Sequence, residues 1–550
     1  MRALGGAGWS RRAPSMWIVP LLSVVSVAWL GLLVVTSSNL GFARDEGFYF
    51  SAARSYAQWF DLLHQNWRGA LEPGVVDAAW SVNHEHPSLV KSLFALSWLG
   101  LHEHLAWISS GSLAFRLPAM ALSAFCVFCT GTLAAEAFGT AAGLAAAGFL
   151  AMCPGFFHHA HLACFDAPIA ALWVLVAWAH LRALRMRSVG SFIVLGIAYG
   201  LALETKHNAW MLPAVLVPHG LLFGRRSVLG KPVFPWAIIA PYLIGPGVFV
   251  ALWPWLWHDT WARMQGYAAF HLHHDYYNIE FLGRNVFSPP APLAYLPVVV
   301  LATVPTTMVL AALFGMVARH NWLPSDGFSS RSTTHRDAAL VVFCVLAVGA
   351  SFGPFFLPNT PIFGGYKHWL QAYPFAAMLA GRGAAVGLAA LCDRLQAGRR
   401  ALATGLGLVA VLAGASAVTL HAHPFGIAPY VPGIGGMRGG ARLGLNRQFW
   451  GYTTLNVAGV LNALPLRSRV FIHDTAWDSW AQLQSEGVVR GDLQATFAPS
   501  DADAALVHHE LHMNEVEHSI WVAFETQSPK AVLTHDGVPY VSVYTRRTPK

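Results

Sequence analysis

The stretch Trp17–Thr36 (WIVPLLSVVSVAWLGLLVVT) decides the fold, because it is apolar, uncharged and long enough to cross a bilayer as one helix. A short polar linker separates it from Arg44-Asp45-Glu46-Gly47. Similar apolar runs recur along the chain, so this acidic pair is expected at the membrane–water boundary of a polytopic protein. An acidic pair is poorly placed there for packing, and we expect it to serve chemistry.

The overall composition indicates an integral membrane protein. Hydrophobic residues make up 55% of the 550 residues and charged residues 11%, whereas soluble domains have about 25% charged residues. The formal net charge of +8 comes from short basic clusters between apolar runs, which is the topology signal of membrane proteins and predicts no nucleic-acid partner. The six cysteines lie in or beside apolar runs, so no disulfide framework is expected.

The apolar runs predict about eleven membrane spans. They are residues 17–36, 115–135, 139–157, 166–184, 189–204, 209–224, 233–255, 293–317, 337–357, 369–391 and 401–420. Four basic clusters between these spans all fall on the cytoplasmic side if the N-terminus is cytoplasmic, in agreement with the positive-inside rule. These clusters lie at residues 182–187, 225–231, 319–336 and 394–400.

With this orientation the long polar segments are external. They are residues 37–114, 256–292, 358–368 and 421–550, with a short external turn at 204–208. In the first of these segments, Ser88–Leu101 is apolar with a single lysine and too short to span, which predicts a helix lying on the membrane surface.

The tail has a different character from the rest of the chain. Short β-type runs are expected to form strands, with a helix at Asp478–Glu486 between the first two. The runs are Arg469–His473, Ala504–His508, Ile520–Phe524 and Tyr540–Tyr544. The predicted fold is therefore mainly α: a polytopic membrane helical bundle at residues 1–420, including the first external loop at 37–114, and a small external α/β domain at 421–550.

Polar residues gather at the external ends of several predicted spans. Asp166 opens one span, Glu204 and Lys206 close another, and Lys367-His368 opens a third. Ionisable residues at membrane depth are functional candidates, because their desolvation must be compensated. Each one alone is also compatible with an ordinary helix-end charge that reaches water. Their gathering on a single face favours function.

Carboxylates and lysines at an outer membrane boundary suit group transfer from a lipid phosphate. Lys206 and Lys367 can hold a phosphate as point charges. A carboxylate within hydrogen-bond reach can accept the proton of an attacking hydroxyl. Such a donor arrives from the bilayer, so no soluble nucleotide-binding domain is needed, and the sequence shows no nucleotide fingerprint.

Short motifs follow one another in a specific order over most of residues 15–420. They are Asp45-Glu46, His86-Pro87, Phe115-Arg116-Leu117-Pro118, Phe165-Asp166-Ala167-Pro168, Gly200-Leu201-Ala202-Leu203-Glu204-Thr205-Lys206, and Tyr366-Lys367-His368 with Tyr373-Pro374. In this order and placement the chain resembles the GT-C membrane glycosyltransferases. More narrowly it is similar to glycosyltransferase family 39 and its relatives, the protein O-mannosyltransferases and the bacterial lipid A aminoarabinose transferases.

The resemblance implies a GT-C-type bundle and an inverting transfer of a hexosyl or pentosyl group from a polyprenyl-phosphate donor to a hydroxyl on the external face. Asp45 matches the family's essential acidic position, so it is expected to be the catalytic base or to orient the acceptor, with Glu46 as its companion. The residues expected at the donor phosphate or the substrate are Lys206, Lys367, Asp166, His86, Tyr366 and His368. A bacterial inner membrane is the expected location, with the active site on the periplasmic side.

The sequence departs from the family pattern at two places. The common His-Pro-Pro is His86-Pro87-Ser88 here, and Lys367-His368 replaces an arginine often found near the Tyr-Pro pair. The identity of the sugar therefore stays open, and so does the acceptor, for which a protein hydroxyl, lipid A and an envelope glycan are all candidates.

A second hypothesis is a metal-handling membrane transporter or metalloenzyme, because neutral imidazoles bind zinc well. Against it, the external histidine clusters at 84–86, 158–161 and 271–274 contain no pair with the i, i+4 zincin spacing, and no polar residues interrupt the spans as a translocation path requires. The transferase hypothesis implies no definite cofactor. A divalent metal ion is the one cofactor for which the question stays open. Its candidate ligands are Asp45, His84, His86, His158 and His159.

Overall fold

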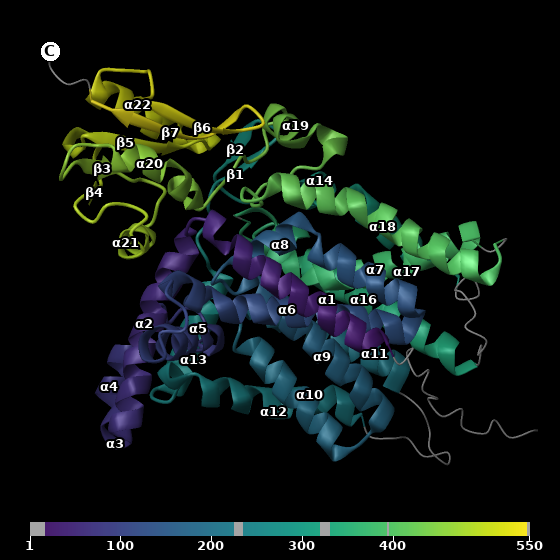
Figure 1. Ribbon diagram of the computed structural model, residues 1–550. Coiled ribbons are helices and arrows are strands. Elements are labelled where there is room, and N and C mark those ends of the chain that lie inside the picture. The colour runs from purple at the N-terminus through teal and green to yellow at the C-terminus, as the bar shows by residue number, and fades with distance from the viewer. Residues whose placement is uncertain (1–16, 225–234, 320–330, 363, 393–394, 547–550) are drawn as a thin grey trace, which may run out of the picture.

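The computed structural model describes residues 17–224, 235–319, 331–362, 364–392 and 395–546. Long helices form a bundle, and the C-terminal part of the chain forms a sheet with short helices at one end of it (Figure 1). Among the described residues, six helices are long and apolar enough to cross a membrane, or up to eight segments if each of two bent pairs is one span. The prediction of a mainly α, polytopic bundle with a small C-terminal sheet is confirmed.

The six long helices coincide with six of the predicted spans. They are α1 (Ile18–Thr36), α6 (Gly111–Phe138), α9 (Asp166–Met186), α16 (Arg331–Phe352), α17 (Tyr373–Cys392) and α18 (Ala397–Ala422). Two more predicted spans are broken helices. They are α7 (Thr140–Ala151) with α8 (Pro154–His161), bent by 63°, and α14 (Tyr295–Thr303) with α15 (Thr306–Val317), bent by 115°.

Proline accounts for both breaks, because it cannot continue the helical hydrogen bonding of the preceding turn. Pro154 is the first residue of α8, and Pro305 is the N-cap of α15. The remaining three predicted spans are helices shorter than the roughly 20 residues that a crossing needs. They are α10 (Val189–Leu203), α11 (Pro213–Gly224) and α12 (Trp236–Leu252).

Small residues let the helices of the bundle approach closely, as is common in membrane proteins. A Cβ atom added at Gly200 of α10 would lie 2.5 Å from the Cβ of Val248 in α12. A Cβ added at Gly383 of α17 would lie 2.0 Å from the carbonyl oxygen of Ala311 in α15. Either substitution would push two helix backbones apart.

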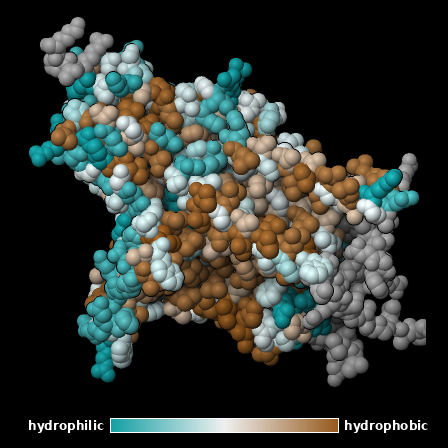
Figure 2. Space-filling view, in the orientation of Figure 1, coloured by the Kyte–Doolittle hydropathy of each residue, from teal (hydrophilic) through white to brown (hydrophobic). Residues whose placement is uncertain are grey.

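The molecular surface agrees with a membrane setting. Figure 2 shows a broad hydrophobic surface over the helical bundle and hydrophilic residues over the C-terminal sheet region. Along α18, Leu402, Leu406, Val409 and Leu420 are 62–66% exposed. Such a row of exposed aliphatic side chains is suited to lipid and not to water.

The first external segment is largely helical. Its elements are α2 (Arg44–Gln65), α3 (Trp67–Ala70), α4 (Pro73–Trp80) and α5 (Leu89–Ser97). The helix predicted at Ser88–Leu101 is α5 followed by a π-helical turn at Trp98–His104. Helix α5 buries Val90 and Phe94 in the hydrophobic core that α2 shares with the C-terminal sheet. It therefore packs the first external segment and the C-terminal sheet together. The second external segment holds α13 (Thr260–Leu272) and the hairpin of β1 (Ile279–Phe281) and β2 (Arg284–Val286).

The C-terminal sheet has five strands in the order β4-β3-β5-β7-β6. Strands β4 and β5 pair parallel to β3, whereas β7 pairs antiparallel to β5 and β6. The strands are β3 (Arg469–Phe471), β4 (Gln494–Thr496), β5 (Ala504–His508), β6 (Ala531–His535) and β7 (Val538–Thr545), and the helices are α19 (Gly436–Arg442), α20 (Ala458–Asn462), α21 (Trp477–Ser485) and α22 (Asn514–Phe524).

One strand prediction in this region is wrong. Ile520–Phe524 forms the end of α22 and not a strand. Ile520 and Phe524 are four residues apart and both buried, which is the spacing of one helix face, so tertiary packing overrides the β-type composition. Strands β4 and β6 were not predicted. The division into domains at residue 420 stays a prediction, although α18 does end at Ala422.

Some of the basic residues that predict the topology lie outside the described residues. This holds for the basic cluster at 225–231, for residues 320–330 of the cluster at 319–336, and for Arg394. The orientation of the protein in the membrane therefore stays a prediction.

Candidate functional site

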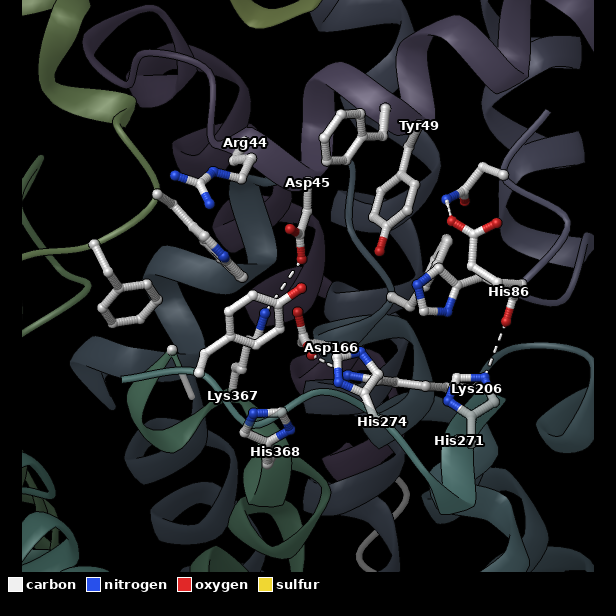
Figure 3. Close-up of a pocket in the computed structure, with 18 of the residues that line it drawn as sticks. Arg44, Asp45, Tyr49, His86, Asp166, Lys206, His271, His274, Lys367 and His368 are labelled. Carbon is white, nitrogen blue, oxygen red and sulfur yellow. Dashed lines mark hydrogen bonds and ion pairs between the residues drawn. The ribbon is translucent and has the colours of Figure 1, made fainter. Parts of the chain in front are cut away.

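A cavity of about 530 Å³ lies where the first turns of α2 and α9 meet the loop before α17 and the C-terminal region (Figure 3). Six of the residues that the sequence assigned to the site line it, and they come from segments up to several hundred residues apart. These are Asp45, His86, Asp166, Lys206, Lys367 and His368.

Asp45 and Lys367 form the first ion pair of the cavity. Asp45 is in the first turn of α2, and its Oδ2 lies 3.2 Å from Nζ of Lys367. Lys367 belongs to the 3-10 helix Gly365–Ala372 and also lies 4.0 Å above the ring of Trp450. The Lys367 side chain is 6% exposed and the Asp45 side chain 24%, so the carboxylate is the more accessible partner.

Gly364 explains how the backbone brings Lys367 to this position. Its φ angle is +65°, which an L side chain rarely adopts. A Cβ added at Gly364 would also lie 2.8 Å from Cε of Lys367. The glycine therefore permits both the turn and the path of the lysine side chain.

Asp166 and Lys206 form the second ion pair, at 2.6 Å between Oδ1 and Nζ. Asp166 is the first residue of α9, and Lys206 follows the end of α10. Nδ1 of His159 lies 3.7 Å from the other carboxylate oxygen. Both partners are buried, and each compensates the desolvation of the other, because an unpaired buried charge is costly.

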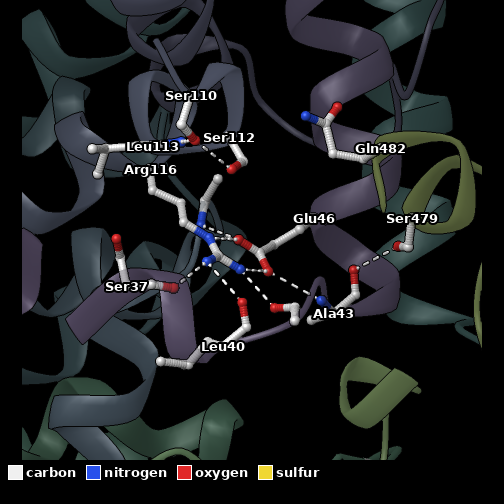
Figure 4. A network of polar contacts seen from close by, with 12 residues as sticks. Ser37, Leu40, Ala43, Glu46, Ser110, Ser112, Leu113, Arg116, Ser479 and Gln482 are labelled. Atoms are coloured by element: carbon white, nitrogen blue, oxygen red, sulfur yellow. Dashed lines mark hydrogen bonds and ion pairs between the residues drawn. The ribbon is translucent and has the colours of Figure 1, made fainter. Parts of the chain in front are cut away.

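Glu46 does not lie in this cavity, which corrects its expected part in the chemistry. Its fully buried carboxylate faces Arg116 of α6, with 2.8 Å from Nε to Oε1 and 2.9 Å from Nη2 to Oε2 (Figure 4). The backbone N–H groups of Ala43 and Ala163 donate to the same carboxylate. All its acceptor capacity is therefore used in the structure.

Arg116 completes this network by donating to the carbonyl oxygens of Ser37, Leu40 and Gly41 (Figure 4). The pair thus joins the end of α1, the start of α2 and α6. Since Asp45 is the neighbour of Glu46, the network fixes the first turn of α2 from which Asp45 points into the cavity. Glu46 acts as a positioning residue.

Tyr366 also lies outside the cavity. It is 1% exposed, and its hydroxyl donates to the carbonyl oxygen of Gly426 at 2.5 Å. The hydroxyl group is directed away from the cavity, so the structure does not agree with the expected contact between Tyr366 and the substrate. The neighbouring His368 does line the cavity.

Imidazoles form one wall of the cavity. His86 packs its ring against Phe165 and His271, and Nε2 of His271 lies 2.9 Å from the carbonyl oxygen of Glu85. Burial and the neighbouring His271 lower the pKa of His86 well below its usual value. Burial also lowers the pKa of His271 to about 4, although its bond to Glu85 opposes the shift. Both rings are neutral at pH 7.

The C-terminal region supplies three further ionisable cavity residues that were not predicted: Asp474, Glu510 and His512. Asp474 pairs with Arg44, which precedes Asp45. Burial, with the nearby carboxylates of Asp474 and Glu280, raises the pKa of Glu510 well above its usual value. The sequence held one usable signal, because Asp474 and Glu510 follow the carboxyl ends of the parallel neighbours β3 and β5, where ligands often bind.

The residues expected to bind a metal do not converge. The Nδ1–H of His84 donates to the Ser81 carbonyl oxygen, and its ring packs at a tilt against Trp255, away from the cavity lining. His158 is buried against Tyr452. Among the described residues, none of the predicted ligands belongs to a group of three donors close enough to share an ion.

Two other donor groups do meet this condition. In each of them, one ligand atom per residue lies within 4.8 Å of the others. The first is Glu280, Glu510 and His512, in and beside the cavity wall, and the second is His421, His535 and Asp536.

Comparisons with known proteins agree with the sequence analysis. Residues 101–258 match the family model of the dolichyl-phosphate-mannose-protein mannosyltransferases. This match confirms the predicted resemblance to GT-C glycosyltransferases. No curated protein matches the chain.

Several solved structures are similar over most of the chain. ArnT from Cupriavidus metallidurans, bound to undecaprenyl phosphate, is 14% identical with a TM-score of 0.47, and the match covers 96% of this chain and 98% of ArnT. The Archaeoglobus fulgidus oligosaccharyltransferase is 12% identical with a TM-score of 0.44, covering 92% and 71%. Arabinosyltransferase EmbB from Mycobacterium smegmatis is 14% identical with a TM-score of 0.40, covering 92% and 45%.

Proposed function

We propose that this multi-pass membrane protein is a GT-C glycosyltransferase that transfers a sugar from a polyprenyl-phosphate donor to a hydroxyl group on the external face, with inversion at the sugar carbon. The observation that carries the proposal is the convergence of two lysine–carboxylate pairs in one cavity. The pairs are Asp45 with Lys367 and Asp166 with Lys206. The family-model match supports the general class of the reaction.

The lysines serve the donor phosphate in this proposal. Lys206 and Lys367 line the same cavity, and both are already held in place by a carboxylate. A phosphate between them would receive two charge-assisted hydrogen bonds, which are stronger than neutral ones. Phosphate binding would also stabilise the leaving group, because charge develops on its oxygen as the bond to the sugar breaks.

Asp45 serves the acceptor. Its carboxylate accepts the proton of the attacking hydroxyl while the hydroxyl oxygen bonds to the sugar carbon and the bond from that carbon to the phosphate oxygen breaks. The products are the glycosylated acceptor, the polyprenyl phosphate and protonated Asp45. A donor phosphate that attracts Lys367 would weaken the 3.2 Å pair with Asp45 and leave the carboxylate free to take the proton.

The acceptor enters from the side of the C-terminal region. Arg44 and Phe48 line the cavity and also a second hollow of about 370 Å³ beside β3 and α21. The two hollows are thus neighbours, and Asp45 lies next to Arg44 at their boundary. A protein hydroxyl, lipid A and an envelope glycan all remain candidate acceptors, and the proposed setting is the periplasmic side of a bacterial inner membrane.

The competing function is a metal transporter. Purified protein in lipid vesicles, supplied with a radiolabelled polyprenyl-phosphate sugar, should hydrolyse the donor slowly or transfer its sugar. Metal-ion uptake without donor turnover would favour the transporter and refute the proposal. If a product forms, its anomeric configuration by NMR should be opposite to that of the donor.

A further inference from the structure

A group of three metal-binding side chains lies outside the proposed active site. His421 is in the last turn of α18, whereas His535 ends β6 and Asp536 follows it in the turn to β7. One candidate ligand atom of each residue lies within 4.8 Å of the others. All three are described residues, and none of them lines the proposed active-site cavity.

The hairpin holds two of these ligands in a defined geometry. His535 pairs with Val538, so Asp536 and Gly537 form a two-residue turn. Their φ angles are +51° and +74°, as the type I′ turns of tight hairpins require. Nε of Arg438 donates to the backbone carbonyl of Asp536 and not to its carboxylate, which leaves the carboxylate for His421.

The contacts between the three side chains form a convergent donor set. Nε2 of His421 lies 2.9 Å from Oδ2 of Asp536, and the rings of His421 and His535 are 5.1 Å apart. A hydrogen bond between His421 and Asp536 accounts for the positions of these two side chains but not for that of His535. Among the described residues no hydrogen bond of the His535 ring nitrogens is seen, so its lone pair has no protein partner there.

We propose that His421, His535 and Asp536 form a zinc-binding site that joins the last membrane helix to the β6–β7 hairpin. Two imidazoles and one carboxylate are a recurrent donor set for Zn²⁺, with a fourth position left for water. Space for this water is available, because all three residues line a hollow of about 550 Å³. Mg²⁺ and Ca²⁺ prefer all-oxygen sites and fit this set less well.

The bound ion would restrain the sheet relative to the bundle. Strand β7 lies between β6 and β5 in the sheet, and Glu510 follows β5 into the cavity wall. A zinc link between α18 and the hairpin would therefore reduce the freedom of the sheet that closes one side of the cavity. This role does not depend on which reaction the cavity performs.

The test uses the full-length protein purified in detergent, treated with a chelator and titrated with Zn²⁺ by calorimetry. His421→Gln is the first variant, because this side chain is 64% exposed and its loss disturbs little packing. Loss of an outer-shell partner costs 10- to 100-fold in metal affinity, so loss of a direct ligand should weaken binding by at least about 100-fold. Asp536→Asn should do the same, whereas His518→Ala on α22 should bind like the wild type.

Thermal unfolding provides a second readout that separates lost binding from lost folding. Zinc should raise the unfolding midpoint of the wild type and of His518→Ala, and leave that of His421→Gln unchanged. His512→Ala tests the donor group in the cavity wall. Zinc binding that survives both His421→Gln and Asp536→Asn, or that disappears only in His512→Ala, would overturn the proposal.

Discussion

Replacing Glu46 by glutamine should destabilise the protein strongly. The carboxylate accepts four hydrogen bonds: Nε of Arg116 (2.8 Å) and N of Ala163 (2.9 Å) on Oε1, and Nη2 of Arg116 (2.9 Å) and N of Ala43 (3.0 Å) on Oε2. An amide keeps one acceptor oxygen and turns the other into an NH₂ group that faces two donors. Two hydrogen bonds are lost, and the buried guanidinium loses its counter-charge.

The expected cost follows from these losses. Hydrogen bonds to charged groups contribute about 1.5–3 kcal/mol each, so two of them amount to about 3–6 kcal/mol. Breaking a buried ion pair by removing one partner costs about 3–5 kcal/mol, which agrees. We therefore expect the free energy of unfolding to fall by about 3–5 kcal/mol.

The assay is equilibrium unfolding with sodium dodecyl sulphate in mixed micelles, followed by tryptophan fluorescence. Asp77→Asn is the matched control, because Asp77 also pairs with an arginine through two hydrogen bonds, of 2.7 and 2.9 Å to Arg263. The Asp77 side chain is 38% exposed, so its loss should cost only about 0.2–1 kcal/mol. Equal losses in the two variants would refute the assignment of Glu46 as the buried anchor of α2.

Three further predictions concern the donor, the topology and the pH dependence. Lys206→Gln and Lys367→Gln should each raise the KM for the donor by about 10- to 100-fold, because each variant loses one charged hydrogen bond to the phosphate. An unchanged KM in kinetic assays would exclude phosphate contacts of these lysines. A reporter fused after Arg400 should be cytoplasmic and one fused after Lys550 external; two reporters on one side would refute the orientation. His271 takes up a proton near pH 6.5 in the unfolded state but only near pH 4 in the folded state. The free energy of unfolding should therefore decrease as the pH is lowered from about 6.5 to about 4. In thermal melts, the His271→Gln variant should lose less stability over this pH range than the wild type.

The membrane-spanning part of the fold could be predicted from the sequence, because the bilayer imposes a length and a composition on each helix. The predicted span at 17–36 and α1 at Ile18–Thr36 agree closely. The breaks before Pro154 and at Pro305 could also have been predicted from proline itself. The helical state of Ile520–Phe524 could not, because it depends on packing against a sheet whose strands are distant in sequence.

The candidate site was predicted where charge stands out against an apolar sequence. Asp45, Asp166, Lys206 and Lys367 are conspicuous for this reason, and the structure brings them together. Glu46 is equally conspicuous, but its partner Arg116 lies in another helix, and no local pattern shows which carboxylate of an adjacent pair faces the cavity. Residues of the polar tail are harder to predict, because charge is ordinary there.

The central claim is that Asp45 takes the proton of the acceptor while the lysines hold the donor phosphate. The most direct test is the release of polyprenyl phosphate at saturating donor and acceptor, where donor binding no longer limits the rate. Asp45→Asn should lower this rate by about 100- to 10,000-fold, the usual contribution of a general base. Asp61→Asn on the same helix is the control and should keep the wild-type rate. An Asp45→Asn rate within about threefold of the wild type would contradict the account, because general-base catalysis contributes far more.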